Sequence, residues 1–446
     1  MVFLIIILAI LIGEYLLNLI VEIKNVRHLR TDLPDEFSGY YNREKYRKSQ
    51  EYLKENTRFG LITDSIATPL TIAFILFGGF NLIDQFARGF HLSTIPTGLI
   101  FAGVIMLASQ IVAIPFSIYS TFVIEEKYGF NKTTPKTFVL DILKTWLLAA
   151  LIGGILFSAV LWFFEEAGPW AWAYCWIAVT LFQVFLLFVA PVVIMPIFNK
   201  FVPLEDGELR AAIEEYAKKQ DFKLKGVFTM DGSRRSTKSN AFFTGFGRFR
   251  RIVLFDTLIG KQTKDELVSV LAHEMGHYKK KHILKSIVIS ILTTGLMFYI
   301  LSLFINNREL FAAFQMQHTS IYASLFFFGF LYAPIDMILS VFGNMLSRRH
   351  EYQADDYAVA TYRKPQSMIT ALKKLSVDNL SNLTPHPLKV FLTYSHPPVL
   401  ERIRAIQRSG VRSQESEKRV ARNLQLAHAN PQYPVSNLTT DRKKVI

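Results

Sequence analysis

Residues 172–195 read WAYCWIAVTLFQVFLLFVAPVVIM, an unbroken run without a single Lys, Arg, Asp or Glu. An α-helix needs about 20 predominantly apolar residues to cross the hydrocarbon core of a bilayer. The run is therefore long enough to span a membrane. Pro191 near its end is compatible with a span, because membrane helices tolerate proline better than soluble helices do.

Six further apolar runs of similar length resemble this one. Together they predict seven spans, at about residues 3–20, 62–83, 98–121, 142–164, 172–195, 283–305 and 321–343. The composition agrees, because 51% of the 446 residues are hydrophobic and only 19% are charged. No basic residue precedes the first run, so we expect a span there and no cleavable signal peptide. The sequence predicts a mainly α, polytopic membrane protein.

The formal net charge of +14 has two readings. A basic surplus can indicate nucleic-acid binding, but on a membrane protein it more often marks orientation, and we expect no nucleic-acid partner. Basic residues crowd two of the loops, at Lys24, Arg27, Arg30, Arg43, Lys45, Arg47, Lys48, Lys54, Arg58, Lys127, Lys132 and Lys136. The alternate loops contain almost no Lys or Arg. This places the N-terminus outside and the C-terminus in the cytoplasm.

The segment 199–282 is more polar and is predicted to be a cytoplasmic α+β unit. It begins with an amphipathic helix at about 208–219, and residues 226–230 and 251–255 read as strands. Residues 240–246 are predicted to form an edge strand. We divide the chain into 1–198 (spans one to five), 199–282, 283–343 (spans six and seven) and 344–446. Beyond about Gly410 we expect a surface helix and a loose terminus.

Residues 273–277 read HEMGH and lie on a helix predicted to begin near Thr263. Histidines at i and i+4 share one helix face, so His273 and His277 can bind one tetrahedral ion. Glu274 points beside that ion, where it can act as the general base for a metal-activated water. A chance match is the alternative, but the predicted helix lies in the polar segment directly before a span. The pattern predicts a zinc-dependent hydrolase.

A catalytic zinc needs a third protein ligand and an open position. Cys175 is the only cysteine and lies in an apolar run, so the ligand must be His or carboxylate. Glu351, where the seventh span emerges, is the best candidate. Asp355 lies one turn further and could hydrogen-bond the remote nitrogen of a ligand imidazole. Alternatively, both acids belong to a solvated helix face paired with Arg348 and Arg349.

His350 and His282 compete with Glu351 as the third ligand. His350 and Glu351 lie about 100° apart on a helix, so both cannot face the metal. We expect the zinc helix to run directly into the sixth span, and Glu351 to leave the seventh, so that two neighbouring membrane helices hold the ligands.

Around these residues the chain resembles the type I CAAX prenyl protease family of integral-membrane zinc metalloproteases. The match covers most of the chain. It rests on HEMGH and on residues 347–355 (SRRHEYQAD), 122–132 (FVIEEKYGFNK), 196–201 (PIFNKF), 230–233 (MDGS), 239–243 (SNAFF), 394–398 (YSHPP) and 401–402 (ER).

The resemblance implies seven helices around a water-filled chamber, with one zinc ion near its cytoplasmic end and Glu351 as the third ligand. It implies that Asn240 and its strand bind substrate backbone by β-addition. It also implies that His396 and Arg402 contact the substrate carbonyl and the developing oxyanion. Without the resemblance, His396 reads as a turn residue and Arg402 as a solvated helix charge.

The substrate expected from the resemblance is a peptide or membrane protein, prenylated or not, that is cleaved at the membrane. Only residues 260–264 separate the last strand from the zinc helix, where eukaryotic members often carry an insertion, which favours a bacterial inner-membrane protein. The terminal Lys443-Lys444-Val445-Ile446 has the form of a retrieval signal for the endoplasmic reticulum. A bacterial member would act as a quality-control endopeptidase. A transporter or scaffold is the remote alternative, for which Glu14, Asp84 and Asp336 would be the supporting features.

Overall fold

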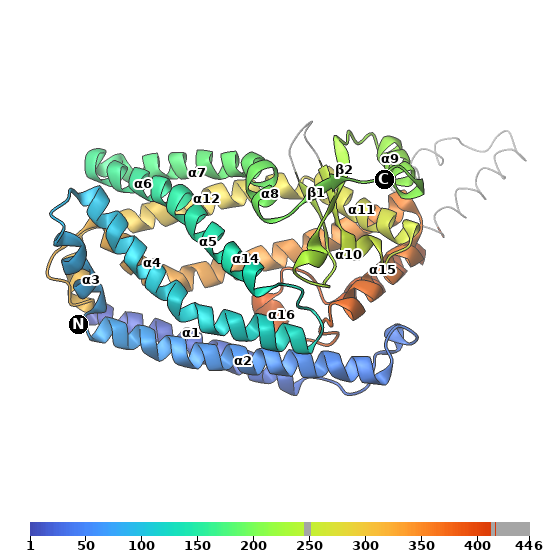
Figure 1. The fold of residues 1–446 in the computed structure, drawn as a ribbon, viewed down its shortest axis with the longest axis horizontal. Coiled ribbons are helices and arrows are strands. Elements are labelled where there is room, and N and C mark those ends of the chain that lie inside the picture. The colour runs from blue at the N-terminus through green and yellow to red at the C-terminus, as the bar shows by residue number, and fades with distance from the viewer. Residues whose placement is uncertain (245–250, 412–414, 416–446) are drawn as a thin grey trace, which may run out of the picture.

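The computed structural model describes residues 1–244, 251–411 and 415. Its long helices run roughly along one axis, and the small sheet lies at one end of the helical bundle (Figure 1). Seven helical segments are long and apolar enough to cross a membrane, which confirms the predicted number of spans in the described part of the chain. The predicted tail beyond Gly410 and the terminal Lys443–Ile446 lie almost wholly outside the described residues.

All spans but the sixth are longer than the hydropathy predicts, and three spans contain a π-helical turn. They comprise α1 (Val2–Arg27); α2 (Arg43–Leu76); α4 (Thr94–Tyr119) with the turn Ser120–Glu125; α5 (Pro135–Leu148), Ala149–Gly153 and α6 (Gly154–Glu166); α7 (Ala171–Val189), Ala190–Ile194 and α8 (Met195–Phe198); α12 (His282–Ser302); and α14 (Ile321–Tyr362). The shorter helices outside the sheet unit include α3 (Gly79–Arg88), α13 (Arg308–Ala313), α15 (Pro365–Asp378) and α16 (Pro387–Thr393), and a further helix spans 399–411.

The predicted end of the second span is wrong. It was expected to reach residue 83, but α2 ends at Leu76 and Gly78 adopts a left-handed conformation with φ 69°. A separate helix, α3, starts at Gly79, where a Cβ would lie 2.3 Å from the ring of Phe74. Glycine thus permits both the left-handed turn at Gly78 and the close packing at Gly79.

The seventh span differs in the opposite direction. α14 continues about five turns past the predicted end at 343, without a break before Tyr362. Its first half is apolar and its second half carries His350, Glu351 and Asp355. One rigid helix therefore joins the membrane part to the candidate site.

The predicted α+β unit has a four-stranded sheet in the order β1-β2-β4-β3. The strands are β1 (Phe201–Pro203), β2 (Gly226–Met230), β3 (Ala241–Thr244) and β4 (Arg251–Phe255), and the helices are α9 (Glu208–Lys219), α10 (Asp256–Ile259) and α11 (Lys264–Lys279). β2 and β4 are parallel, and β3 is antiparallel to β4 at the edge of the sheet. Residues 245–246 of the predicted edge strand lie outside the described residues.

α11 starts at a capping box formed by Thr263 and Glu266. The Thr263 N–H donates to the Glu266 carboxylate at 2.7 Å, and the Glu266 N–H donates back to the Thr263 hydroxyl at 3.4 Å. We expected this helix to run directly into the sixth span, and that prediction is wrong. The helix ends at Lys279, and Lys281 adopts a left-handed conformation with φ 58° before α12 begins. The break lets the two helices point in different directions.

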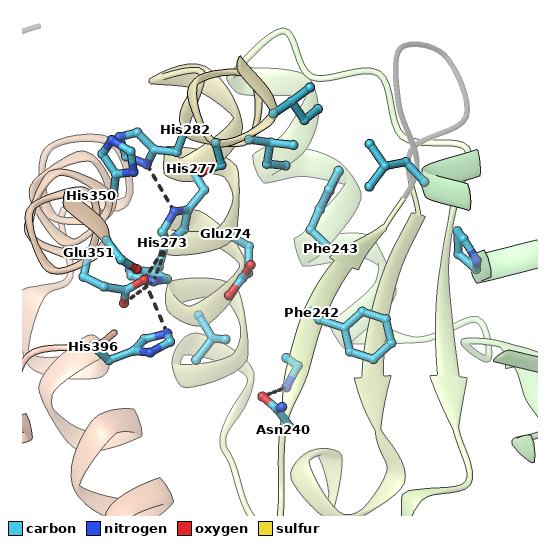
Figure 2. Close-up of a pocket in the computed structure, with 18 of the residues that line it drawn as sticks. Asn240, Phe242, Phe243, His273, Glu274, His277, His282, His350, Glu351 and His396 are labelled. Atoms are coloured by element: carbon cyan, nitrogen blue, oxygen red, sulfur yellow. Dashed lines mark hydrogen bonds and ion pairs between the residues drawn. The ribbon is translucent and has the colours of Figure 1, made fainter. Parts of the chain in front are cut away.

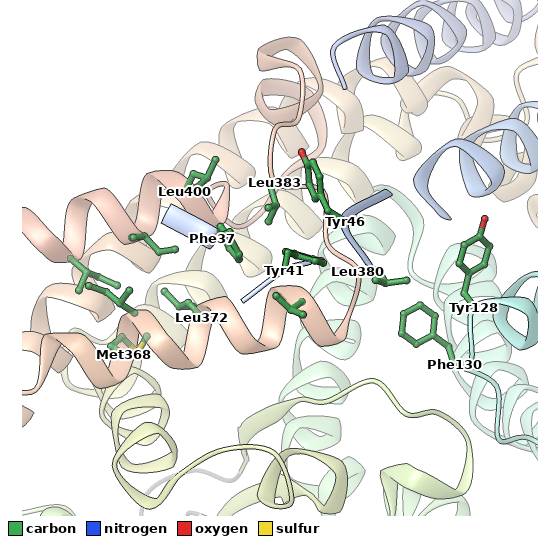
Figure 3. Close-up of a cluster of buried hydrophobic side chains, with 14 of the residues drawn as sticks. Phe37, Tyr41, Tyr46, Tyr128, Phe130, Met368, Leu372, Leu380, Leu383 and Leu400 are labelled. Carbon is green, nitrogen blue, oxygen red and sulfur yellow. The ribbon is translucent and has the colours of Figure 1, made fainter. Parts of the chain in front are cut away.

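A hydrophobic cluster joins the first loop to the C-terminal part of the chain (Figure 3). Phe37 and Tyr41 of that loop are buried against Leu372 of α15 and Leu400. The Tyr41 hydroxyl also donates to the carbonyl of Ser376 at 3.2 Å. Segments more than 300 residues apart in sequence are therefore packed into one core.

Candidate metal centre

The site forms where α11 packs against α14, and a glycine sets how closely the helices approach. A Cβ on Gly276 would lie 3.0 Å from the Cα of Ala354 and 3.1 Å from its carbonyl oxygen. A larger residue would push the two backbones apart, because backbone atoms cannot rotate away. Gly276 lies directly before His277, and Ala354 lies between Glu351 and Asp355. The close contact therefore brings the two sets of candidate ligands together.

The structure brings His273, His277 and Glu351 into one cluster whose ligand atoms all lie within 4.8 Å of one another. The Nε2 atoms of the two histidines are 3.1 Å apart. They lie 3.4 Å and 3.1 Å from the Glu351 carboxylate oxygens. Two imidazoles and one carboxylate are a donor set that zinc prefers in catalytic sites. The buried side chain of Glu351 adds the negative charge that a cation would neutralise.

Asp355 and Arg402 hold His273 from behind. The Nδ1 of His273 lies 2.8 Å from Asp355 Oδ1, so Nδ1 carries the proton and Nε2 is left to bind a metal. Arg402 donates twice to Asp355, from Nε at 2.9 Å and Nη2 at 2.7 Å. Its Nη1 lies 3.2 Å from Glu351 Oε2. One buried arginine thus contacts both the candidate ligand Glu351 and Asp355, the carboxylate behind His273.

A second chain of contacts, which no sequence pattern predicts, supports His277. The Nδ1 atoms of His277 and His282 are 3.1 Å apart, and the Nε2 of His282 lies 2.9 Å from Gln353 Oε1. Since the Gln353 oxygen only accepts, His282 Nε2 is the donor there and its Nδ1 accepts from His277. This leaves the Nε2 of His277 unprotonated.

From the sequence, His282 and His350 are predicted only as competing ligands. The imidazole of His350 is buried and stacks on that of His282, with ring centroids 3.9 Å apart. Neither belongs to the cluster of three ligand atoms. No spacing rule pointed to Gln353, although it lies inside the segment 347–355.

Glu274 faces a cavity of about 1260 Å³ that starts at this cluster and continues between α7 and α12. In Figure 2 its carboxylate lies between the histidines and the edge strand. The far part of the cavity is lined by apolar residues that include Leu187, Pro191, Ile283 and Ile287. Burial raises the pKa of the Glu274 carboxyl, and the neighbouring His273 and His277 act in the opposite direction.

β3 presents its open edge to the same cavity, with Asn240 at its start (Figure 2). The Phe255 N–H donates to the Asn240 carbonyl at 3.1 Å. Asn240 and Phe255 are therefore a hydrogen-bonded pair of the β3–β4 ladder. Hydrogen-bonded and non-hydrogen-bonded pairs alternate in an antiparallel ladder. Ala241 and Phe243 therefore direct their backbone groups away from β4. The Asn240 side chain accepts from the Ala241 N–H at 2.8 Å.

His396 and Arg402 also line the cavity, from a loop after α16 and from a helix at 399–411. His396 is exposed, and its Nε2 lies 3.5 Å from Glu351 Oε1. Arg402 is buried, and its guanidinium is bound to Asp355 and Glu351 rather than solvated. The cavity is thus lined by every sequence-predicted site residue except Asp355, which lies behind His273, and these residues come from four separate segments of the chain.

Two family descriptions match most of the chain. Residues 22–200 match the CAAX prenyl protease N-terminal family, which has five membrane helices. Residues 203–409 match peptidase family M48. The boundary between the two matches falls where the last span of the first half gives way to β1.

Curated relatives match along nearly their whole length. A CAAX prenyl protease 1 homolog of Arabidopsis thaliana is 34% identical over 406 residues, which cover 89% of this chain and 95% of that protein. CAAX prenyl protease 1 of Saccharomyces cerevisiae is 35% identical over 402 residues, covering 84% and 88%. The crystal structure of S. mikatae Ste24p superposes with a TM-score of 0.86 at 34% identity, over 91% of this chain and 99% of that one.

Proposed function

The chain belongs to peptidase family M48 as a CAAX prenyl protease 1 homologue, a membrane-embedded metalloprotease, and we propose that its metal is a single zinc ion held by His273, His277 and Glu351. The observation that carries this assignment is the cluster of two imidazole nitrogens and one buried carboxylate. A zinc ion there would supply Lewis-acid chemistry and lower the pKa of a water molecule.

The proposed roles of the protein residues follow from their positions. Glu274 takes the proton of the attacking water and passes it to the leaving amine, a task for which its raised pKa is suited. Asp355 fixes the tautomer of His273. His396 and Arg402 face the reacting carbonyl from the α14 side and stabilise charge that develops on its oxygen. Three of the five N–H donors of Arg402 contact Asp355 and Glu351, so a remaining N–H would serve the substrate.

We propose that the substrate lies extended along β3. The open backbone groups of Ala241 and Phe243 support β-addition, which holds a peptide without regard to its side chains. Asn240 would release the Ala241 N–H as the substrate binds, and its amide would then contact substrate backbone. The apolar far part of the cavity suits an aliphatic group attached to that substrate.

The substrate class proposed is a C-terminal peptide carrying a prenylated cysteine, cleaved at the cytoplasmic surface of the membrane. The support is that the reported relatives are named CAAX prenyl proteases, and that the basic loops lie at the end of the bundle that bears the site. A bacterial inner-membrane origin stays a prediction, and the relatives reported above are eukaryotic.

The test offers purified protein three substrates: a peptide with a prenylated C-terminal cysteine motif, the same peptide without the prenyl group, and an unrelated unfolded membrane protein. We expect cleavage of the prenylated peptide, and a loss of about 100- to 10,000-fold in Glu274→Gln with zinc retained. Equal cleavage of all three substrates would favour the quality-control role. Full activity of Glu274→Gln would refute the mechanism.

A further inference from the structure

A second groove lies outside the catalytic site, between α1 and α2. It encloses about 460 Å³ and is lined by Glu22, Ile23, Val26, Arg27, Lys54, Thr57, Arg58, Leu61, Ile62, Ser65 and Ile66. The lining residues of α2 recur at helical spacing, so they form one continuous stripe on that helix. We call this surface the α1–α2 groove.

The α1–α2 groove is polar at one end and apolar along the rest. The helices pair in antiparallel fashion, since Tyr15 bonds to Ser65 at 2.9 Å and Asn18 bonds to Asp64 at 2.8 Å. Higher residue numbers on α1 therefore lie beside lower residue numbers on α2. Arg27 of α1 and Lys54 of α2 consequently lie at the same end, and the apolar residues follow toward the membrane.

The three cations of this groove have no acidic partner in the described part of the chain. Its one acid, Glu22, is already paired with Lys389 of α16. The acids of the same stretch of α2 are also occupied: Glu51 by Arg47, Glu55 by Lys127 and Asp64 by Asn18. Lys54 and Arg58 are moreover four residues apart on one helix, where like charges repel.

We propose that an anionic phospholipid binds in the α1–α2 groove, with its phosphate on Arg27, Lys54 and Arg58 and an acyl chain along Leu61, Ile62 and Ile66. The ligand must be both anionic and apolar, because the cations and the aliphatic residues form one surface. Arginine donates pairs of hydrogen bonds to phosphate oxygens. The spans are surrounded by lipid, and basic pockets beside spans are known to bind anionic headgroups. The proposal does not depend on the peptidase activity.

The test uses the full-length protein in detergent, titrated with dioleoyl phosphatidylglycerol or dioleoyl phosphatidylcholine and followed by native mass spectrometry. We expect one tight adduct with phosphatidylglycerol and weaker binding of phosphatidylcholine. The triple variant Arg27→Gln, Lys54→Gln, Arg58→Gln should bind phosphatidylglycerol at least about tenfold more weakly. Retained zinc content and an unchanged unfolding temperature would show that the variant is folded.

A matched variant removes the same charge elsewhere, through Lys24→Gln, Arg43→Gln and Lys136→Gln. These three side chains are exposed and lie outside the groove. We expect this variant to bind phosphatidylglycerol like the wild type, and Ile66→Trp, which fills the apolar part, to bind both lipids more weakly. Equal losses in both triple variants, equal affinity for the two lipids, or displacement of phosphatidylglycerol by inorganic phosphate would each overturn the proposal.

Discussion

His273 has to lose a proton before it can bind a metal, and its surroundings oppose that loss. Burial by itself lowers the pKa of this imidazole, but the carboxylates of Asp355 and Glu351 raise it to about 9 in the metal-free protein. The zinc ion proposed for this site would therefore compete with a proton at every pH below that value. Zinc affinity should rise about tenfold per pH unit between pH 7 and 9.

Competition with a chromophoric chelator over this range measures the effect. In Asp355→Asn the neighbouring charge is gone, so the pKa of His273 should fall and the affinity should become flatter with pH. An affinity of the wild type that stays constant from pH 7 to 9 would contradict the prediction.

His282 accepts a hydrogen bond from Nδ1 of His277 and so keeps the proton on that nitrogen, as Asp355 does for His273. His282→Ala should lower zinc affinity by about 10- to 100-fold, the usual cost of removing a partner of a ligand. His282→Asn should recover part of the loss, because its amide oxygen can accept from His277 Nδ1. Chelator competition measures both variants. If His282→Asn behaves like His282→Ala, the role of the acceptor is refuted and only packing is left.

At the residue scale, spacing predicts only those ligands that share a helix. His273 and His277 follow from i,i+4 geometry, whereas Glu351 is 74 positions beyond His277 and needs two spans to return to it. Asp355 is predictable once Glu351 is chosen, because it lies one turn away. Gln353 is not, since its partner His282 is on another helix.

At the scale of elements, the α11–α14 contact depends on the missing side chain of Gly276. Gly276→Ala places a Cβ 3.0 Å from the Cα of Ala354, so the helices must separate. We expect a loss of about 1–3 kcal/mol in stability, and weaker zinc binding because Glu351 moves away from the histidines. Thermal unfolding and zinc content measure the two effects.

Gly343→Ala is the matched control. Gly343 lies in the same helix, α14, and a Cβ there meets nothing within 4 Å. Alanine is the better helix former by about 1 kcal/mol, so this variant should be neutral or more stable. A Gly276→Ala protein as stable as Gly343→Ala would show that the two helices can adapt.

Hydropathy predicts which segments cross the membrane but not where their helices end. The second span ends early because the chain turns at Gly78, and α11 breaks from α12 at Lys281; both residues take a left-handed conformation. Neither feature changes the local hydropathy. The strands at 226–230 and 251–255 were predictable because β-branched and aromatic residues concentrate there.

At the scale of the whole molecule, the first span is joined to α16 close to the site. Glu22 of α1 pairs with Lys389, and Asn25 accepts from the backbone of His386 at 3.1 Å. These contacts hold α16, which leads into the loop with His396. Contacts between residues so far apart in sequence depend on the arrangement of all the helices, so no local sequence pattern predicts them.

The first loop also connects the N-terminal part of the chain to the C-terminal helices. Phe37 is a residue of this loop that is buried among them. Its side chain is 0% exposed in the cluster that contains Leu400 and Ile403, the neighbours of Arg402. Phe37→Ala should cost about 3–5 kcal/mol, because it leaves a cavity where no other side chain can move in freely. It should also speed zinc release, since the helix at 399–411 that carries Arg402 loses its support.

Thermal unfolding and the rate of zinc transfer to a chelator measure these two effects. Phe77→Ala is the control, because Phe77 is 88% exposed and the same atoms are removed without a cavity. Faster zinc release in Phe37→Ala alone would show that a residue on the first loop acts on the site through the C-terminal helix. Equal behaviour of the two variants would mean that the catalytic half holds its metal without help from the N-terminal part of the chain.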